Sequence, residues 1–138
     1  MNELEEKIAS VYPVGDSGTP AFVVTYDPSV PEIGIPIEAQ LHRIKTDVSY
    51  TLTYTVTNES GELVGNATGV VLIDRDSVKD DPAQLFSDNT VMVSVRTMIA
   101  PVRIRTTESE NLKVTVVMFS NEMATAPSHT YLTTRPQS

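Results

Sequence analysis

Alternation of apolar and polar residues recurs along most of the chain and predicts β-strands. The clearest segment is 48–57 (VSYTLTYTVT), in which Val, Tyr and Leu alternate strictly with Ser and Thr. Successive side chains of a strand point to opposite faces, so this segment predicts one buried apolar face and one wet face. The NESG sequence that follows predicts a turn, after which the chain returns antiparallel through 63–64 and 70–73.

Weaker patterns predict further strands before and after this hairpin. Residues 22–26 and 112–118 are rich in Val, apolar residues recur at every second position of 112–118, and residues 131–132 suggest a last short strand. Between Val91 and Ile104 the apolar positions shift by one residue at Pro101. A shift of this kind predicts a β-bulge, or a strand that crosses between two sheets, at Pro101.

Two other segments are less regular. Prolines 28, 31 and 36 interrupt the stretch before residue 37, and proline cannot donate to a sheet, so we expect an edge strand or an irregular connection there. Residues 74–89 are polar and acidic, which predicts a long loop with one helical turn.

About seven strands follow one another with no helical crossover between the main ones. This order predicts an all-β, antiparallel β-sandwich, immunoglobulin-like or jelly-roll-like, with a small barrel as the alternative. The hallmarks of antibody domains are absent, because the chain has no Trp and no Cys. We expect residues 21–123 to form the sandwich domain, with an arm or short helix at 1–20 and a strand or tail at 124–138.

The short helix is predicted by apolar spacing at the N-terminus. Leu4, Ile8 and Val11 fall at positions i, i+4 and i+7, and charged residues occupy most of the other positions. A helix of this length is marginal on its own and must dock on its own domain or on a partner. These three residues are therefore candidate interface residues.

Composition narrows the classes of function. A chain of 138 residues is one domain by size, and its net charge of −8 argues against binding to nucleic acid or to an anionic membrane surface. The absence of cysteine excludes disulfides, thiolate nucleophiles and Cys-based zinc sites. The charged N-terminal residues do not resemble a signal peptide, and no apolar run is long enough to span a membrane. We expect an intracellular or virion location.

An acidic loop is the candidate metal site. Asp74, Asp76, Asp80 and Asp81 lie within eight residues, and calcium prefers six to eight oxygen ligands. The segment lacks the glycine of an EF-hand loop, and Arg75 and Lys79 partly neutralise it. A solvated acidic loop is the simpler interpretation.

Candidate catalytic residues are few. The sequence around Ser17 (GDSG) resembles the nucleophile motif of trypsin-like proteases, but in that family the catalytic His and Asp precede the Ser, and here no His does. A different order could use His42 or His129, the only histidines. A turn leading into the first strand explains the motif better.

Arg103 and Arg105 flank Ile104 and share one face of a strand. They form either a small interface patch or the partners of Glu108 and Glu110 across a hairpin.

Together these observations predict a non-enzymatic structural or protein-interaction module that self-associates or joins a larger assembly such as a virion. A calcium-dependent or acidic-surface binding domain is the alternative, and a hydrolase is the third hypothesis. We expect no catalytic residue and no cofactor other than calcium in that alternative.

Overall fold

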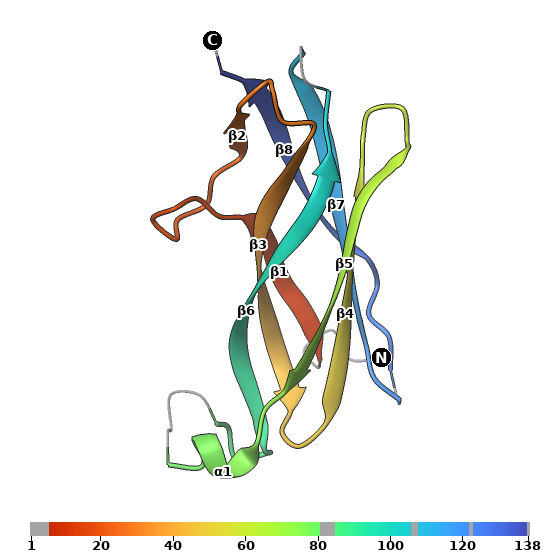
Figure 1. Cartoon of the computed structure of the whole chain (residues 1–138). Helices are drawn as coiled ribbons and strands as arrows, with labels where there is room; N and C mark the ends of the chain where they lie inside the picture. The colour runs from red at the N-terminus through yellow and green to blue at the C-terminus, as the bar shows by residue number, and fades with distance from the viewer. Residues whose placement is uncertain (1–5, 81–84, 106–107, 122, 138) are drawn as a thin grey trace.

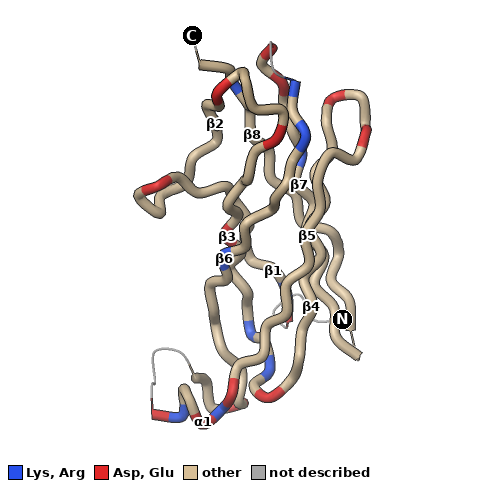
Figure 2. Tube along the Cα trace, in the orientation of Figure 1, with Lys and Arg blue, Asp and Glu red and all other residues tan. Residues whose placement is uncertain are grey.

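A computed structural model describes residues 6–80, 85–105, 108–121 and 123–137. Almost all regular structure in these residues is β-strand, with one short helix, and eight strands form two sheets packed face to face (Figure 1). The predicted β-sandwich is confirmed. Charged residues gather mainly in the loops and at the two ends of the sandwich (Figure 2).

The two sheets differ in size. The three-stranded sheet has the order β1 (Lys7–Pro13), β3 (Glu32–Lys45) and β6 (Thr90–Arg103). The five-stranded sheet has the order β2 (Val23–Tyr26), β8 (Ser128–Pro136), β7 (Glu110–Phe119), β4 (Ser49–Thr57) and β5 (Leu63–Leu72). Helix α1 (Arg75–Val78) lies between β5 and β6 in the chain, so the helical turn predicted for the acidic loop is confirmed.

One strand pair departs from the predicted antiparallel arrangement. β2 and β8 run parallel, with Val23 opposite Thr133, whereas all other strand pairs are antiparallel. After β1 the chain crosses into the five-stranded sheet for β2 and then returns for β3. No hairpin joins β2 to β8, so no turn constrains their relative direction.

The core lies between the inner faces of the sheets. Four side chains of β4 are fully buried, as the strict alternation predicts: Tyr50, Leu52, Tyr54 and Val56. The central strand β3 contributes five more: Ile35, Ile37, Ala39, Leu41 and Ile44. Each large side chain buried in this way contributes about 1.5–3 kcal/mol of transfer free energy.

The prediction drawn from the prolines before residue 37 is confirmed for residues 27–31, which form an irregular connection between β2 and β3, and is wrong for residues 32–36. Residues 32–45 form the central strand β3, which pairs with both β1 and β6, rather than an edge or an irregular connection. The carbonyl of Pro36 accepts a hydrogen bond from the amide of Val14, 3.0 Å away, just past the end of β1. In an antiparallel strand the nitrogen of a residue points to the same side as its carbonyl, so the missing N–H of Pro36 faces the place where β1 ends.

The helix predicted at the N-terminus is also wrong over its described part. Residues 7–13 form β1, which pairs with β3 from Lys7 opposite His42 to Pro13 opposite Ile37. A register shift between Ile8 and Ser10 explains why the apolar spacing departs from strict alternation. Ile8 is buried in the core and Val11 packs against it, while Leu4 lies outside the described residues. Pairing with β3 satisfies backbone groups that a marginal helix would have to satisfy alone.

The bulge predicted at Pro101 is confirmed. Ile33 pairs with Val102 and Ile35 with Ile99, so β6 carries Ala100 and Pro101 opposite the single residue Gly34. Ile99 and Val102 are both buried although three positions separate them. The extra residue thus keeps the apolar side of β6 on the core.

Gly65 of β5 lies close to Pro101 and Val102 of β6, and this contact gives a first prediction. An added Cβ would lie 2.9 Å from Cγ2 of Val102 and 3.4 Å from the carbonyl oxygen of Pro101. We expect Gly65→Ala to lower the free energy of unfolding by about 1–3 kcal/mol through overpacking, measured by urea denaturation.

Gly69 in the same strand is the matched control. Its added Cβ would lie 3.6 Å from Oγ1 of Thr97, an ordinary contact. Gly69→Ala should change the free energy of unfolding by about 1 kcal/mol or less, towards higher stability. Equal effects of the two substitutions would contradict the close approach at Gly65.

A second prediction concerns alkaline pH. Burial raises the pKa of Tyr54 above its ordinary value of 10.0, and the hydrogen bond from Thr97 offsets part of that rise. The stability that depends on the neutral ring is therefore present below the unfolded-state pKa and is lost as pH rises through the raised pKa. Urea denaturation between about pH 8 and 11 should show this loss, and Tyr54→Phe should make it shallower. If the pH dependence is unchanged in Tyr54→Phe, the loss of stability at alkaline pH is caused by groups other than Tyr54.

Candidate functional site

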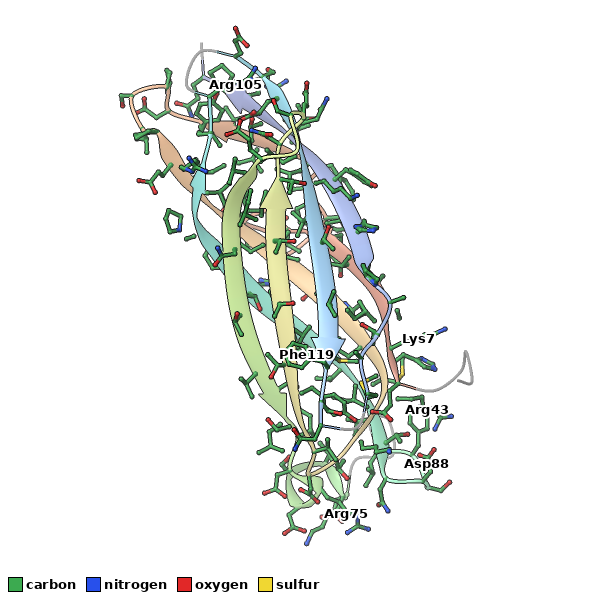
Figure 3. All side chains as sticks on the ribbon, turned by 90° about the vertical axis from the view of Figure 1, so that its right-hand side faces the viewer. Lys7, Arg43, Arg75, Asp88, Arg105 and Phe119 are labelled. Atoms are coloured by element: carbon green, nitrogen blue, oxygen red, sulfur yellow. The ribbon has the colours of Figure 1, made fainter. Side chains whose placement is uncertain are left out.

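Polar side chains form clusters at both ends of the sandwich, with Arg105 at one end and Arg43, Arg75 and Asp88 at the other (Figure 3). Arg43 stacks 3.8 Å above the ring centre of Phe86, and its Nη1 lies 3.4 Å from Oδ1 of Asp88. Hydrogen bonding by the Thr90 hydroxyl is the main reason why the pKa of Asp88 is lowered, and the charge of Arg43 adds to it. These contacts tie the loop before β6 to the end of β3.

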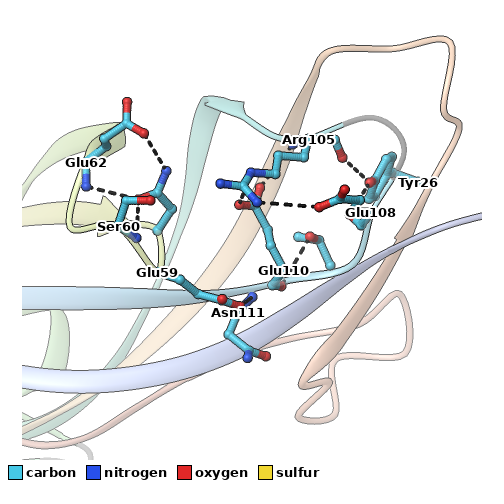
Figure 4. Close-up of polar contacts among 10 residues, drawn as sticks. Tyr26, Glu59, Ser60, Glu62, Arg105, Glu108, Glu110 and Asn111 are labelled. Atoms are coloured by element: carbon cyan, nitrogen blue, oxygen red, sulfur yellow. Dashed lines mark hydrogen bonds and ion pairs between the residues drawn. The ribbon is translucent and has the colours of Figure 1, made fainter.

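The Arg105 cluster ties together the other end (Figure 4). The main-chain N–H of Arg105 donates to Oε1 of Glu110 (3.0 Å), and its Nε lies 3.8 Å from Oε2 of the same carboxylate. Nη1 of Arg105 lies 3.5 Å from Oε2 of Glu108. The hydroxyl of Tyr26 donates to the carbonyls of Arg105 and Glu108. Arg105 therefore has the glutamate partners that its place in the sequence suggested.

Electrostatics and burial indicate that this cluster supports the fold. The Glu110 side chain is 4% exposed, whereas those of Arg105 and Glu108 are 56% and 67% exposed. Burial, and then the negative charge of Glu110, raise the pKa of Tyr26. A protonated tyrosine that donates to two carbonyls is a clamp for the loop and not a nucleophile.

Arg103 lies beside a groove between the edge strands β5 and β6. The groove has a volume of about 350 Å³ and is lined by Glu32, Leu63, Val64, Gly65, Asn66, Ala100, Pro101 and Arg103. The Nη2 of Arg103 donates to the carbonyl of Leu63, 2.8 Å away. The guanidinium therefore caps one end of β5, and the groove lining offers no nucleophile paired with a base.

The outer face of the three-stranded sheet carries a polar network that the sequence did not reveal. The Tyr12 hydroxyl donates to Oε2 of Glu38 (2.6 Å) and accepts from Nε2 of Gln40 (3.1 Å). Nη2 of Arg96 lies 3.4 Å from Oε1 of Glu38, and the Ser94 hydroxyl donates to Gln40. The hydrogen bond to Glu38 is the main reason why the pKa of Tyr12 is raised. The network spans all three strands, and each of these groups has a partner within it.

The structure does not assemble a triad from the candidate nucleophile and the histidines. The Ser17 hydroxyl lies 2.8 Å from that of Thr19 in the loop after β1. His129 is on β8 with Nδ1 3.0 Å from the Thr115 hydroxyl, whereas His42 is on β3 in the other sheet. Neither contact joins two members of a triad.

The acidic loop is organised as a helix cap. Oδ1 of Asp74 accepts from the amide of Asp76 (2.9 Å) at the start of α1. Asp74, Asp76 and Asp80 are exposed, and Asp81 lies outside the described residues. Within the described ranges, no three His, Cys, Asp or Glu side chains converge on a point that could hold a metal ion.

The outer face of the five-stranded sheet carries the outer apolar patch, which we define as Val70 and Leu72 of β5 with Val117 and Phe119 of β7. Thr51 of β4 pairs with Val70 on one side and with Phe119 on the other, so the patch crosses three strands. Val70 is 67%, Leu72 60% and Phe119 39% exposed. The uninterrupted apolar run 70–73 was the available signal in the sequence, because an alternating strand would have been apolar on one face only.

No protein-family model matches the sequence, and no curated protein is detectably similar to it. Solved structures share the fold. A bacterial adhesin from Mobiluncus mulieris with intramolecular disulfide, isopeptide and ester cross-links matches with a TM-score of 0.59 and 11% identity, over 95% of this chain and 58% of the adhesin chain. A β-glucuronidase of glycoside hydrolase family 2 matches with a TM-score of 0.58 and 11% identity, over 90% of this chain and 11% of the enzyme chain.

The β-glucuronidase of Bacteroides uniformis gives a similar result, with a TM-score of 0.54 and 11% identity over 91% of this chain and 13% of that chain. The chain therefore spans well under two thirds of each of these proteins and corresponds to one part of each. At such low identity the likeness shows the β-sandwich fold alone. The one described helix, α1, is too short to cross a membrane.

The Arg105 cluster gives a third prediction. Glu110→Ala removes a buried acceptor from the Arg105 amide and should lower the free energy of unfolding by about 1–3 kcal/mol. Glu108→Ala removes an exposed ion pair with the same arginine and should cost about 1 kcal/mol or less. Urea denaturation of both variants checks the difference, and a larger loss in Glu108→Ala would contradict the clamp role of Glu110.

Proposed function

We propose that this chain is a non-enzymatic protein-interaction domain that takes part in a larger assembly. The outer apolar patch carries the proposal. Large exposed apolar side chains that lie together on one sheet face are typical of surfaces that bind other proteins. Phe119 and Leu72 are the kind of side chain that loses most contact with water when such a surface is covered.

The polar clusters favour the same conclusion. The groups around Arg105, Glu38 and Arg43 have internal partners and hold strands or loops in place. Catalysis would need a nucleophile or a base with a free side towards a substrate. Recognition through a sheet face needs only the scaffold that these clusters provide.

The chemistry of the partner follows from the face around the patch. Ser and Thr of β4 separate the apolar residues, and the chain has a net charge of −8. A partner with an apolar centre and a neutral or basic rim fits this surface. The likeness to an adhesin supports an interaction role, and a virion is one assembly in which such a domain would serve.

The fourth prediction tests this function with matched surface variants. Val70→Ser removes one of the four apolar side chains of the patch, and the double variant Val70→Ser/Phe119→Ser removes two, while Tyr131→Ser removes a side chain that is 60% exposed on β8 of the same sheet. Molar mass by light scattering reports self-association. Immobilised domain exposed to proteins of the native source reports a heterologous partner, which is then purified and titrated calorimetrically.

We expect association with the wild type and with Tyr131→Ser, weakened about tenfold or more in the patch variants. Circular dichroism spectra of all variants control for folding. Association that is equally strong in the patch variants, or no association in either assay, would contradict the proposal.

A further inference from the structure

Edge strands are the places where a sheet can add another strand, because alternate backbone N–H and C=O groups point away from the sheet. Proteins usually protect such edges with charges, prolines, bulges or short strands. The described part of this sandwich has four edge strands, namely β1 and β6 in one sheet and β2 and β5 in the other.

Three of the four edges carry such protection. β1 contains Lys7 and Pro13 and has a register shift. β6 contains Arg96 and Arg103, with the bulge at Pro101. β2 has only four residues.

β5 differs from these three. It has ten residues (LVGNATGVVL) and contains neither a charged residue nor a proline. The charge-coloured trace is uniformly neutral along β5 between the loop before it and the loop after it (Figure 2). Its contacts with β6 lie at Leu63 and Gly65, near its first residue, and at Gly69, whose added Cβ would lie 3.6 Å from Oγ1 of Thr97. The remainder, up to Leu72, is a long neutral edge at the margin of the five-stranded sheet (Figure 3).

We propose that β5 pairs antiparallel with β5 of a second copy of this chain, so that two five-stranded sheets join edge to edge. This inference rests on the proposed interaction function and names its partner. A two-fold axis perpendicular to the sheet produces this pairing, which is self-complementary and closes at two copies. The outward side chains of both strands then lie on one face, and Val70 and Leu72 gain neighbours from the second copy.

Charge does not oppose a second copy along this edge. Two chains of net charge −8 repel each other over most of their surface. Along β5 no charged side chain has to be brought beside another, so the edge is a place where two copies can meet at little electrostatic cost. The unpaired backbone groups of one copy find in the other a strand of equal length and equal pattern.

The test uses two lysines placed on the same face of adjacent strands. Thr68 lies outward on β5, and Thr53 is its direct partner on β4. Thr68→Lys puts a charge on the edge, whereas Thr53→Lys puts the same charge one strand away. Light scattering of the wild type over about 1–300 µM should show twice the 15.1 kDa of one chain. The dissociation constant should rise about tenfold or more in Thr68→Lys and change much less in Thr53→Lys.

Amide hydrogen exchange provides a second readout. In the dimer, the outward amides of β5 should exchange slowly, and in Thr68→Lys they should exchange fast, while the β4 amides stay protected in both and show that the fold is intact. A monomeric wild type over the whole range would overturn the inference. If a heterologous protein still bound through the patch residues, the proposed function would survive that result. Equal loss in both lysine variants would also overturn edge pairing and assign the contact to the sheet face.

Discussion

The packing of the two sheets around one core, to which β4 and β3 contribute fully buried side chains, is the contact on which the rest of the structure depends. The chain has no cysteine, so no disulfide contributes, and stability rests on apolar area buried between two sheets. Tyr50, Leu52, Tyr54 and Val56 on one side, and the buried residues of β3 on the other, are all inaccessible to water. A one-residue slip of either strand would turn its apolar set outward, so this packing also fixes register.

The two core tyrosines also form specific hydrogen bonds that limit how the two sheets can move relative to each other. The hydroxyl of Tyr54 accepts from Thr97 of β6, 3.1 Å away in the opposite sheet. The hydroxyl of Tyr50 accepts from the amide of Lys45 at the end of β3 and donates to Glu6. Apolar contact alone allows sheets to slide, whereas a buried hydroxyl must find its partner or lose a hydrogen bond. The tyrosines of β4 therefore hold one sheet in a fixed position over the other.

The features that were predicted correctly from the sequence depend only on the residues of a single strand. The alternation of 48–57 and the change of parity at Pro101 are local, and both are confirmed. The position of Pro36 in a central strand was not predictable, because it depends on where a strand elsewhere in the chain ends. The parallel pairing of β2 with β8 and the Tyr12–Glu38–Arg96 network are equally non-local, since they join residues more than twenty positions apart.

The apolar run 70–73 contains more large apolar side chains than the core requires. Val71 is buried and serves the core, as an alternating strand requires, but Val70 and Leu72 on either side of it point into solvent. Nothing in the packing of the described residues explains two large aliphatic side chains there, and their exposure lowers solubility unless something covers them. The same stretch belongs to β5, the one long edge strand of the described residues that has neither a charged residue nor a proline. A strand that is apolar on both faces over residues 70–72 and neutral along its edge is suited to the interior of a larger sheet, and a single copy of this chain leaves it at the margin.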